Sequence, residues 1–207
     1  QWEGGLAMKN EKQRDIVISG LYKRFGNKRV LHDFSATLSG GGMTVVMGPS
    51  GCGKTTLLQI LMGFVRPDKG QLTGIPHHKS AVFQEDRLCE DFSAISNVQL
   101  ACGRRVSEME IVSHLENLDL AGSLQQPVRE LSGGMRRRVA IVRAMLAPAD
   151  IVFLDEPFKG LDEQTRDKVL RYVLAQTRGR TVVAVTHSRE EAEALGGTLL
   201  RMPAAAC

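Results

Sequence analysis

The sequence predicts an α/β fold built around a parallel sheet. Residues 151–154 are an unbroken apolar run, and residues 181–186 are a second such strand with threonine at each end. This is the pattern of central parallel strands that are covered on both faces. Between them, residues 163–177 place apolar side chains at helical spacing. A third apolar run at 43–47 leads through a glycine-rich turn into a helical pattern at 54–63. Strand, helix and strand in this order imply a right-handed parallel crossover, and therefore an α/β core.

Shorter strands are predicted on both sides of the glycine-rich turn. Residues 16–18 predict one strand. Residues 30–38 predict another, in which two sets of side chains alternate: Leu31, Asp33, Ser35 and Thr37 against His32, Phe34, Ala36 and Leu38. Residues 66–70 contain Pro and Gly and predict a turn. Residues 81–83 predict a short strand that ends at the polar Gln84.

Between about residues 85 and 147 the chain changes to helical spacing, which predicts a helical insertion in the core. The predicted helices lie near 95–101, 109–118 and 134–146. The last of them begins with Arg136, Arg137 and Arg138. We expect these arginines to form a solvated face rather than a nucleic-acid patch, because no aromatic residues are interleaved with them.

Composition bounds the class of protein. With 207 residues, 43% hydrophobic and 24% charged, the chain can build its own core without disulfides or metals. The sequence has no apolar run near the roughly 18 residues of a membrane span. Its four cysteines lack metal-ligand spacing, which favours free thiols and a cytoplasmic protein. The net charge of +4 is small and spread along the chain, so it identifies no partner.

The organisation that we expect is a single domain at residues 15–202, with the helical subdomain at about 85–147 inserted in the α/β core. Residues 1–7 precede Met8, a plausible start, so residues 1–14 are expected to be a leader that is disordered or a remnant of cloning or gene prediction. Residues 203–207 are expected to be a tail. The sequence contains no internal repeat.

The glycine-rich turn has the spacing of a phosphate-binding loop, G-x-x-x-x-G-K-[ST]. Its residues are Gly48, Pro49, Ser50, Gly51, Cys52, Gly53, Lys54, Thr55 and Thr56. The glycines let backbone N–H groups turn inward toward phosphate oxygens. Lys54 supplies a positive charge for the β- and γ-phosphates, the Thr55 hydroxyl can ligate Mg²⁺, and the helix that follows points its positive end at the same anion. The turn therefore predicts a nucleotide site.

Two adjacent acids, Asp155 and Glu156, follow the apolar run 151–154, at the strand end where open α/β sheets bind ligands. Asp155 is predicted to hold Mg²⁺, and Glu156 is predicted to orient and polarise the water that attacks the γ-phosphate. Asp162 is predicted as the N-cap of the next helix, a role that is compatible with a functional one.

A second candidate anion site is the turn formed by Leu131, Ser132, Gly133, Gly134 and Met135, which stands at a helix start. The Ser132 hydroxyl and the N–H groups of the two glycines can bind an anion together with the helix dipole. The alternative interpretation is a simple N-cap, because serine is favoured at that position in any helix. Taken alone, the turn leaves both interpretations open.

The glycine-rich turn, Gln84, the Ser-Gly-Gly turn, residues 151–157, Leu161-Asp162 and His187 together resemble the nucleotide-binding subunit of an ABC transporter, over about residues 15–202. The resemblance implies a P-loop NTPase core with an N-terminal antiparallel β subdomain and an inserted α-helical subdomain. It implies that residues 131–135 are the signature motif and that Asp162 is the D-loop acid. Gln84 would lie near Mg²⁺ and the attacking water, His187 would contact the γ-phosphate, and Phe25, or alternatively Tyr22, would stack on adenine.

The same resemblance implies the partners. Two such subunits, as a homodimer or pseudo-dimer, sandwich two ATP molecules with Mg²⁺, each between the phosphate loop of one subunit and the signature motif of the other. The dimer would work with membrane permease subunits, and with a solute-binding protein, at the inner face of the cell membrane. The family's contact with the permease falls here on residues 85–92, where Cys89 and Phe92 either pack on a permease helix or anchor a surface loop.

Two segments are most similar to importers of the nitrate, sulfonate and taurine type: the sequence Phe83-Gln84-Glu85-Asp86-Arg87-Leu88 and the signature motif ending in Met135. Those importers usually have Leu-Pro-Trp where this chain has Cys89-Glu90-Asp91, and Gln in place of Arg137.

Two other functions are alternatives to a transporter subunit: an ABC-type ATPase that acts on nucleic acid or the ribosome, and a regulatory module that binds ATP without turnover. We expect no nucleic-acid partner, since the chain has neither two cassettes nor a long coiled-coil insertion.

Overall fold

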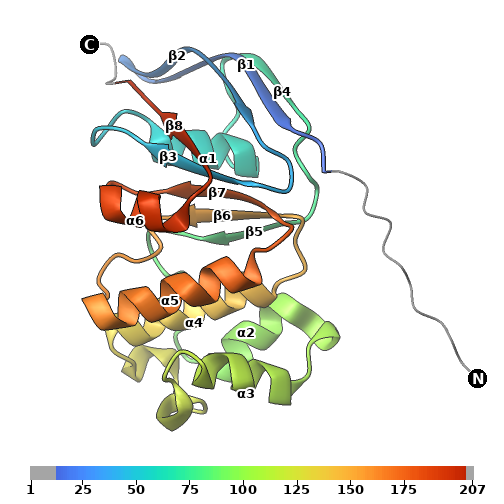
Figure 1. Cartoon of the computed structure of the whole chain (residues 1–207), viewed down its shortest axis with the longest axis vertical. Helices are drawn as coiled ribbons and strands as arrows, with labels where there is room; N and C mark the ends of the chain where they lie inside the picture. Colours follow the sequence, from blue (N-terminus) through green and yellow to red (C-terminus); the bar gives the residue numbers. More distant parts are fainter. Residues whose placement is uncertain (1–12, 204–207) are drawn as a thin grey trace, which may run out of the picture.

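The computed structural model describes residues 13–203. Of the leader expected at 1–14 and the tail expected at 203–207, residues 1–12 and 204–207 lie outside the described residues. Gln13 is bonded to the core: its side chain donates to the carbonyl of Gly179 at 3.2 Å and accepts from the Thr181 hydroxyl at 2.6 Å. Figure 1 shows three layers: an antiparallel sheet, a parallel sheet, and a group of helices on the far side of the parallel sheet. The mixed α/β class with a parallel sheet, an antiparallel β subdomain and helices between the strands is therefore confirmed.

The antiparallel sheet has three strands in the order β2-β1-β4. Their bounds are Ile16–Phe25 for β1, Lys28–Leu38 for β2 and Lys69–Thr73 for β4. Strand β4 contradicts part of the turn predicted at 66–70, because Lys69 pairs with Tyr22 and extends the sheet. In β2 the predicted alternation is interrupted: Leu31, Phe34 and Leu38 all point inward, across a register shift at which Asp33 has a φ of 48°. This bulge changes which face each side chain occupies.

The parallel sheet has five strands in the order β5-β6-β7-β3-β8. Their bounds are Met43–Met47 for β3, Lys79–Val82 for β5, Ile151–Asp155 for β6, Thr181–Val185 for β7 and Thr198–Arg201 for β8. Every residue of β6 and β7 is buried, because helices pack on one face, and α1 with the antiparallel sheet packs on the other. Along β6, for example, Val152 faces the helical side and Phe153 faces the antiparallel sheet.

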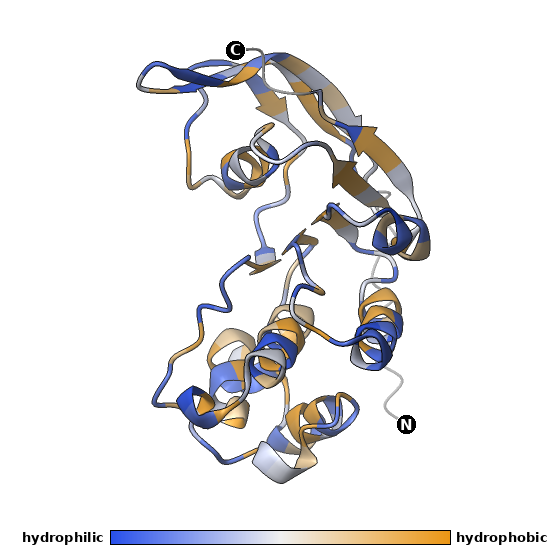
Figure 2. Cartoon of the chain, turned by 90° about the vertical axis from the view of Figure 1, so that its left-hand side faces the viewer, coloured by the Kyte–Doolittle hydropathy of each residue, from blue (hydrophilic) through white to orange (hydrophobic). Residues whose placement is uncertain are grey.

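The helices account for the remaining layers. Helix α1 is Lys54–Met62, α2 is Ala94–Cys102, α3 is Glu108–Glu116, α4 is Gly133–Leu146, α5 is Glu163–Gln176 and α6 is Arg189–Leu195. Three short 3₁₀ turns lie at Gly103–Arg105, Ala121–Ser123 and Val128–Glu130. In Figure 2 the helices are striped with hydrophilic and hydrophobic residues, which is the amphipathic pattern of helices that cover a core on one side. Helix α6 and strand β8 had no counterpart in the sequence prediction.

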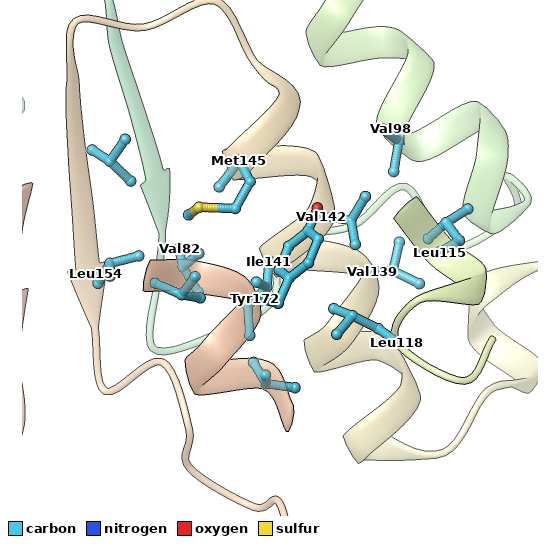
Figure 3. Close-up of a cluster of buried hydrophobic side chains, with 14 of the residues drawn as sticks. Val82, Val98, Leu115, Leu118, Val139, Ile141, Val142, Met145, Leu154 and Tyr172 are labelled. Atoms are coloured by element: carbon cyan, nitrogen blue, oxygen red, sulfur yellow. The ribbon is translucent and has the colours of Figure 1, made fainter. Parts of the chain in front are cut away.

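Helix α4 is the element that joins the helical layer to the parallel sheet. Figure 3 shows Met145 directed toward Val82 and Leu154 of the sheet, while Val139 and Val142 lie on the side of Leu115. Because the helix packs on two sides, half of its 14 residues are buried. This position in the core brings the amino end of α4 close to the carboxyl end of β6, where the predicted acids stand.

Candidate functional site

A pocket of about 460 Å³ lies at the carboxyl ends of the parallel strands. Its lining is Phe25, Lys28, Val30, Ser50, Gly51, Gly53, Lys54, Thr55, Thr56, Gln84, Asp155, Glu156, Lys159, Val185 and His187. These residues come from five separate segments, so the fold brings together most of the predicted nucleotide site. Three lysines against two acids leave the lining with a positive balance, which suits a polyphosphate.

The phosphate loop meets the pocket at the start of helix α1. Gly53 precedes the helix with a φ of 103°, and a Cβ there would lie 2.9 Å from Cγ1 of Val30, so only glycine fits. Since glycine has no side chain with which to cap the helix, the N–H groups of the first turn are left for a ligand. The ammonium of Lys54 donates to the carbonyls of Gly48 at 2.7 Å and Pro49 at 3.0 Å.

The side chains of Pro49 and Cys52 lie on the other side of the loop. Gly48 and Pro49 line a larger, mainly apolar hollow of about 740 Å³ beside strand β8 and helix α6. Cys52 is buried, at 3% exposure, in the core between the two sheets. These residues therefore shape the loop, while the pocket itself is lined by the residues from Ser50 onward, apart from Cys52.

Asp155 has the features of a cation ligand. The residue is 6% exposed, and its Oδ1 atom has no hydrogen-bond partner among residues 13–203. Burial raises the pKa of Asp155, and the neighbouring Glu156 raises it further, while the Thr55 hydroxyl acts in the opposite direction. A carboxylate oxygen without a partner beside a hydroxyl is a pair of hard oxygen ligands, so the donor set fits Mg²⁺. Within the described chain no group of three or more His, Cys, Asp or Glu residues gathers as a metal site.

Glu156 and His187 form a pair across the pocket. The Nδ1 atom of His187 lies 2.8 Å from Oε2 of Glu156, with the histidine exposed and the carboxylate 15% exposed. Glu156 has a φ of 49°, a left-handed conformation that is uncommon for a residue with a side chain. Its N–H donates to the carbonyl of Val185 at 2.9 Å, which ties this conformation to strand β7. A strained backbone beside two titratable groups is a frequent feature of functional sites.

The pocket distinguishes between the two aromatic candidates for adenine stacking. Phe25 lines the pocket and is 49% exposed, with the Lys23 ammonium 5.2 Å from its ring centroid. Tyr22 instead packs edge-on against His32 at 5.0 Å, on a different surface of the antiparallel sheet. The geometry therefore favours Phe25 as the residue that contacts a base.

The Ser-Gly-Gly turn is separate from this pocket, whose lining within residues 13–203 includes none of 131–135 and not Asp162. Ser132 is the N-cap of α4, and its Oγ accepts from the N–H of Met135 at 3.3 Å. Among residues 13–203 no group accepts the hydroxyl hydrogen of Ser132. Asp162 caps α5 in the same way, accepting from the N–H of Thr165 at 3.0 Å. Both capping roles are present, and neither excludes a second role in an assembly.

Sequence reasoning missed several residues of the site. Lys28 and Lys159 line the pocket, although no motif marks them. The prediction of a solvated face for Arg136 to Arg138 is wrong at Arg137, which is 3% exposed. A signal was available: Arg137 lies three and four residues before the buried Ala140 and Ile141, and so on the buried face of the helix.

The segment that follows Gln84 is fastened to the helical layer by a buried amide. The Asn97 side chain is 1% exposed, accepts from the N–H of Cys89 at 2.8 Å, and donates to the carbonyls of Cys89 at 3.0 Å and Phe92 at 3.2 Å. The side chains of Cys89 and Phe92 are left exposed on this anchored loop. The loop therefore presents a fixed surface.

A parallel sheet with a phosphate loop and two acids at the carboxyl ends of its strands defines the class of P-loop nucleotide hydrolases. Comparison with known proteins narrows this class. A family model described as ABC transporter matches residues 31–159. The taurine import ATP-binding protein TauB of Escherichia coli O157:H7 is 39% identical over 191 residues, covering 86% of this chain and 75% of that protein. The protein of the same name from Roseobacter denitrificans is 37% identical over 214 aligned residues, covering 96% and 77%.

Solved structures give the same fold. The dimeric structure of MJ0796, described as a bacterial ABC transporter cassette, aligns with a TM-score of 0.77 and 26% identity, covering 91% of this chain and 94% of that one. A post-hydrolysis dimer of the MJ0796 cassette bound to ADP and Pi aligns with a TM-score of 0.80 at 24% identity, covering 90% and 94%.

The chain belongs to the ABC transporter family, as an ATP-binding and ATP-hydrolysing subunit. The resemblance to the taurine, nitrate and sulfonate type is confirmed by relatives at 36–39% identity. The alternative of an ATPase that acts on nucleic acid or the ribosome is not favoured. Over residues 13–203, none of the helices combines the length and the apolar character that crossing a membrane requires.

Proposed function

We propose that this chain powers the import of a small organic anion of the sulfonate class, such as taurine, through separate permease subunits. The relatives of 36–39% identity that carry the name taurine import ATP-binding protein support this substrate class. In this proposal the chain binds peripherally at the inner face of the cell membrane and cooperates with a solute-binding protein. The single observation that carries the catalytic part is the pair of Glu156 and His187 beside Lys54 in one pocket.

The site residues divide the reaction between them. Glu156 accepts the proton of the attacking water. With both ring nitrogens protonated, His187 donates through Nδ1 to the Glu156 carboxylate, which it orients, and through Nε2 to the γ-phosphate. Gln84 orients the same water. Lys54 and the N–H groups at the start of α1 neutralise the charge that develops on the phosphate oxygens. Phe25 holds the adenine, and Lys28 and Lys159 attract the polyphosphate.

Mg²⁺ would be held by the Thr55 hydroxyl, the Asp155 carboxylate and Gln84. When bound, the ion neutralises charge on the β- and γ-phosphate oxygens. The buried Oδ1 of Asp155, which lacks a partner among the described residues, is the feature that supports this assignment.

The second anion-binding turn supports a dimer in which ATP is shared between two chains. Ser132, Gly133 and Gly134 are placed outside the pocket of their own chain, although their chemistry suits a phosphate. In the proposed dimer, residues 131–135 of each subunit cover the ATP bound to the phosphate loop of the other, with Asp162 beside them. The dimeric form described for the MJ0796 cassette supports this arrangement.

The test is the Glu156→Gln variant, which keeps the shape of the side chain and removes its basicity. We expect kcat for ATP hydrolysis to fall by roughly 10²–10⁴-fold, the usual contribution of a general base. ATP binding should persist, and ATP should promote dimerisation, as measured by fluorescent nucleotide titration and light scattering. Glu116→Gln, which removes an exposed acid of α3, is the matched control and should keep wild-type turnover. Wild-type turnover in Glu156→Gln would exclude Glu156 as the base.

A further inference from the structure

Arg137 is the most completely bonded side chain near the pocket. Its guanidinium has five N–H donors, and five hydrogen bonds are formed. Nε donates to the carbonyl of Pro157 at 2.9 Å, and Nη2 donates to the carbonyls of Asp155 at 3.0 Å and Glu156 at 2.5 Å. Nη1 donates to the carbonyl of Phe83 at 2.5 Å and to Oδ1 of Asp86 at 3.1 Å. The side chain is only 4% exposed.

These acceptors come from two segments that follow neighbouring strands of the parallel sheet. Strands β5 and β6 pair as far as Val82 and Leu154, and Arg137 bridges the two segments beyond the point where this pairing ends. One segment is the end of strand β6, at 155–157, where Glu156 stands in its left-handed conformation. The other is 83–86, which contains Gln84. A second arginine of the same helix, Arg143, donates to the carbonyls of Asp86 at 2.9 Å and Arg87 at 2.7 Å, and so fixes the far side of that segment.

The geometry of the β6 end explains why such a clamp matters. The left-handed region is strained for a residue with a side chain, so Glu156 keeps this conformation only if its surroundings enforce it. The Glu156 carbonyl accepts from Arg137 and from the N–H of Lys159, and its N–H donates to Val185. Because the Glu156 carboxylate reaches the pocket from this backbone, its direction depends on the carbonyls that Arg137 holds.

We propose that Arg137 is a positioning residue for ATP hydrolysis: its guanidinium fixes the backbone of Glu156 and the segment that carries Gln84 relative to one another. The inference rests on the proposed function, in which Glu156 is the base and Gln84 orients the water. A displacement of segment 83–86 changes the hydrogen bonds of the guanidinium that also holds Glu156. The surface loop that follows Gln84 is thereby coupled to the catalytic strand end through one side chain of α4.

Three substitutions test the proposal by the split between kcat and KM. Arg137→Met keeps the volume and removes all donors, Arg137→Gln keeps a short neutral donor, and Arg137→Lys keeps the charge without the fork. We expect kcat to fall by about 100-fold in Arg137→Met and by about tenfold or more in the other two, as positioning errors typically do, with KM for ATP unchanged within about threefold. Arg171→Gln, which removes an exposed arginine of α5, should match wild type.

Rates are normalised to the folded, ATP-binding fraction, so a loss of folded protein alone does not lower them. If Arg137→Met fails to fold, Arg137→Gln decides, and a folded Arg137→Gln protein with wild-type kcat overturns the proposal. A loss of ATP affinity equal to the loss of kcat also overturns it. In the Glu156→Gln background, Arg137→Gln should cost little further activity, because both changes remove the same function. A full additional loss there contradicts action through Glu156, whereas wild-type turnover in Glu156→Gln alone refutes the proposed function instead.

Discussion

Helices α1 and α4 both begin at a glycine-containing turn, but their first turns are satisfied differently. At α1 the N-cap is Gly53, in a left-handed conformation that tolerates no Cβ, and the helix start opens into a pocket of its own chain. At α4 the N-cap is Ser132, whose side chain satisfies the N–H of Met135. A Cβ on Gly133 would meet no atom within 4 Å among the described residues. The chain itself therefore requires glycine at the start of α1, whereas nothing in the described chain requires glycine at position 133 at the start of α4.

The difference teaches how to separate a structural glycine from one that is kept free for a partner. Gly53 is required by its own backbone conformation and by Val30, so the fold explains it. The fold does not explain Gly133 and Gly134, because a Cβ at Gly134 makes only ordinary contacts at 3.6 Å and 3.8 Å. In the proposed dimer these two glycines allow the phosphates of the partner's ATP to approach the backbone.

Among the tests that compare the helix starts, the largest effect is expected from Gly133→Ala. Alanine fits the helical backbone and raises helix propensity, so the melting temperature should stay the same or rise slightly. ATP binding to the separate subunit should be unchanged. Hydrolysis should fall by about tenfold or more, because a methyl group in the donor turn weakens transition-state contacts of oxyanion-hole type. The measurements are steady-state ATPase rates, nucleotide titration and thermal melts of the same preparations.

Gly53→Ala is the matched comparison. It forces a Cβ to within 2.9 Å of Val30 at a φ of 103°, so it should lower the melting temperature and weaken ATP binding in the separate subunit.

A mixture of Gly133→Ala and Lys54→Ala subunits should recover activity that neither has alone, because one composite site of the mixed dimer is intact. Wild-type ATPase in Gly133→Ala, or no recovery in the mixture, would argue against a site shared between chains.

The sequence predicted the segments whose local residue pattern directly reflects their environment in the fold. The run 151–154 is apolar throughout because β6 is covered on both faces, and the loop from Gly48 to Thr56 needs its glycines for a local backbone shape. Helical spacing from Ala140 and Ile141 puts Arg137 on the buried face of α4, but that spacing does not say which groups its guanidinium meets. Three consecutive arginines match an exposed helix face, and the burial of one depends on carbonyls of Phe83 and Pro157, which are 54 and 20 residues away.

Two other errors have the same origin in distant contacts. The Pro-Gly segment at 66–70 has the composition of a turn, yet β4 starts at Lys69, because the edge of β1 offers backbone partners from Val17 to Tyr22. The bulge at Asp33 reverses the facing of the first part of β2, and no alternation rule anticipates a residue that stands out of register. Motifs named most of the residues that line the pocket. The exceptions are Lys28, Val30, Lys159 and Val185, which reach the pocket only through the fold.

An intermediate effect is expected from Phe25→Ala, which tests the base-contacting end of the α1 site. An aromatic contact contributes about 0.5–1.5 kcal/mol beyond its buried area, so ATP affinity should fall by about tenfold. Binding of inorganic tripolyphosphate should not change, since it has no base. Tyr22→Ala, which removes the other aromatic candidate, should leave ATP affinity near wild type because Tyr22 faces His32. Titrations that show the reverse order would assign the base contact to Tyr22.

The smallest effect concerns a third helix start, that of α5, where Asp162 supplies a charged cap. The N–H of Thr165, together with its hydroxyl, lowers the pKa of Asp162 below its usual range. A lowered pKa means that the cap contributes stability above the unfolded-state pKa and loses it as the pH falls through the folded-state pKa. Asparagine caps helices nearly as well but does not titrate.

In Asp162→Asn, the melting temperature should therefore fall less than in wild type between about pH 5 and pH 3, while the two proteins differ little at neutral pH. Asp167→Asn, which removes an exposed acid within the same helix, should keep the wild-type dependence on pH. An equal slope in Asp162→Asn and wild type would mean that the charge of the cap contributes nothing measurable. The start of α5 would then differ from that of α4 only in the residue that supplies the capping oxygen. A weaker pH dependence of the melting temperature in Asp162→Asn would instead show that the Asp162 carboxylate already neutralises the start of α5. The starts of α1 and α4 have no such carboxylate and are left to bind phosphate.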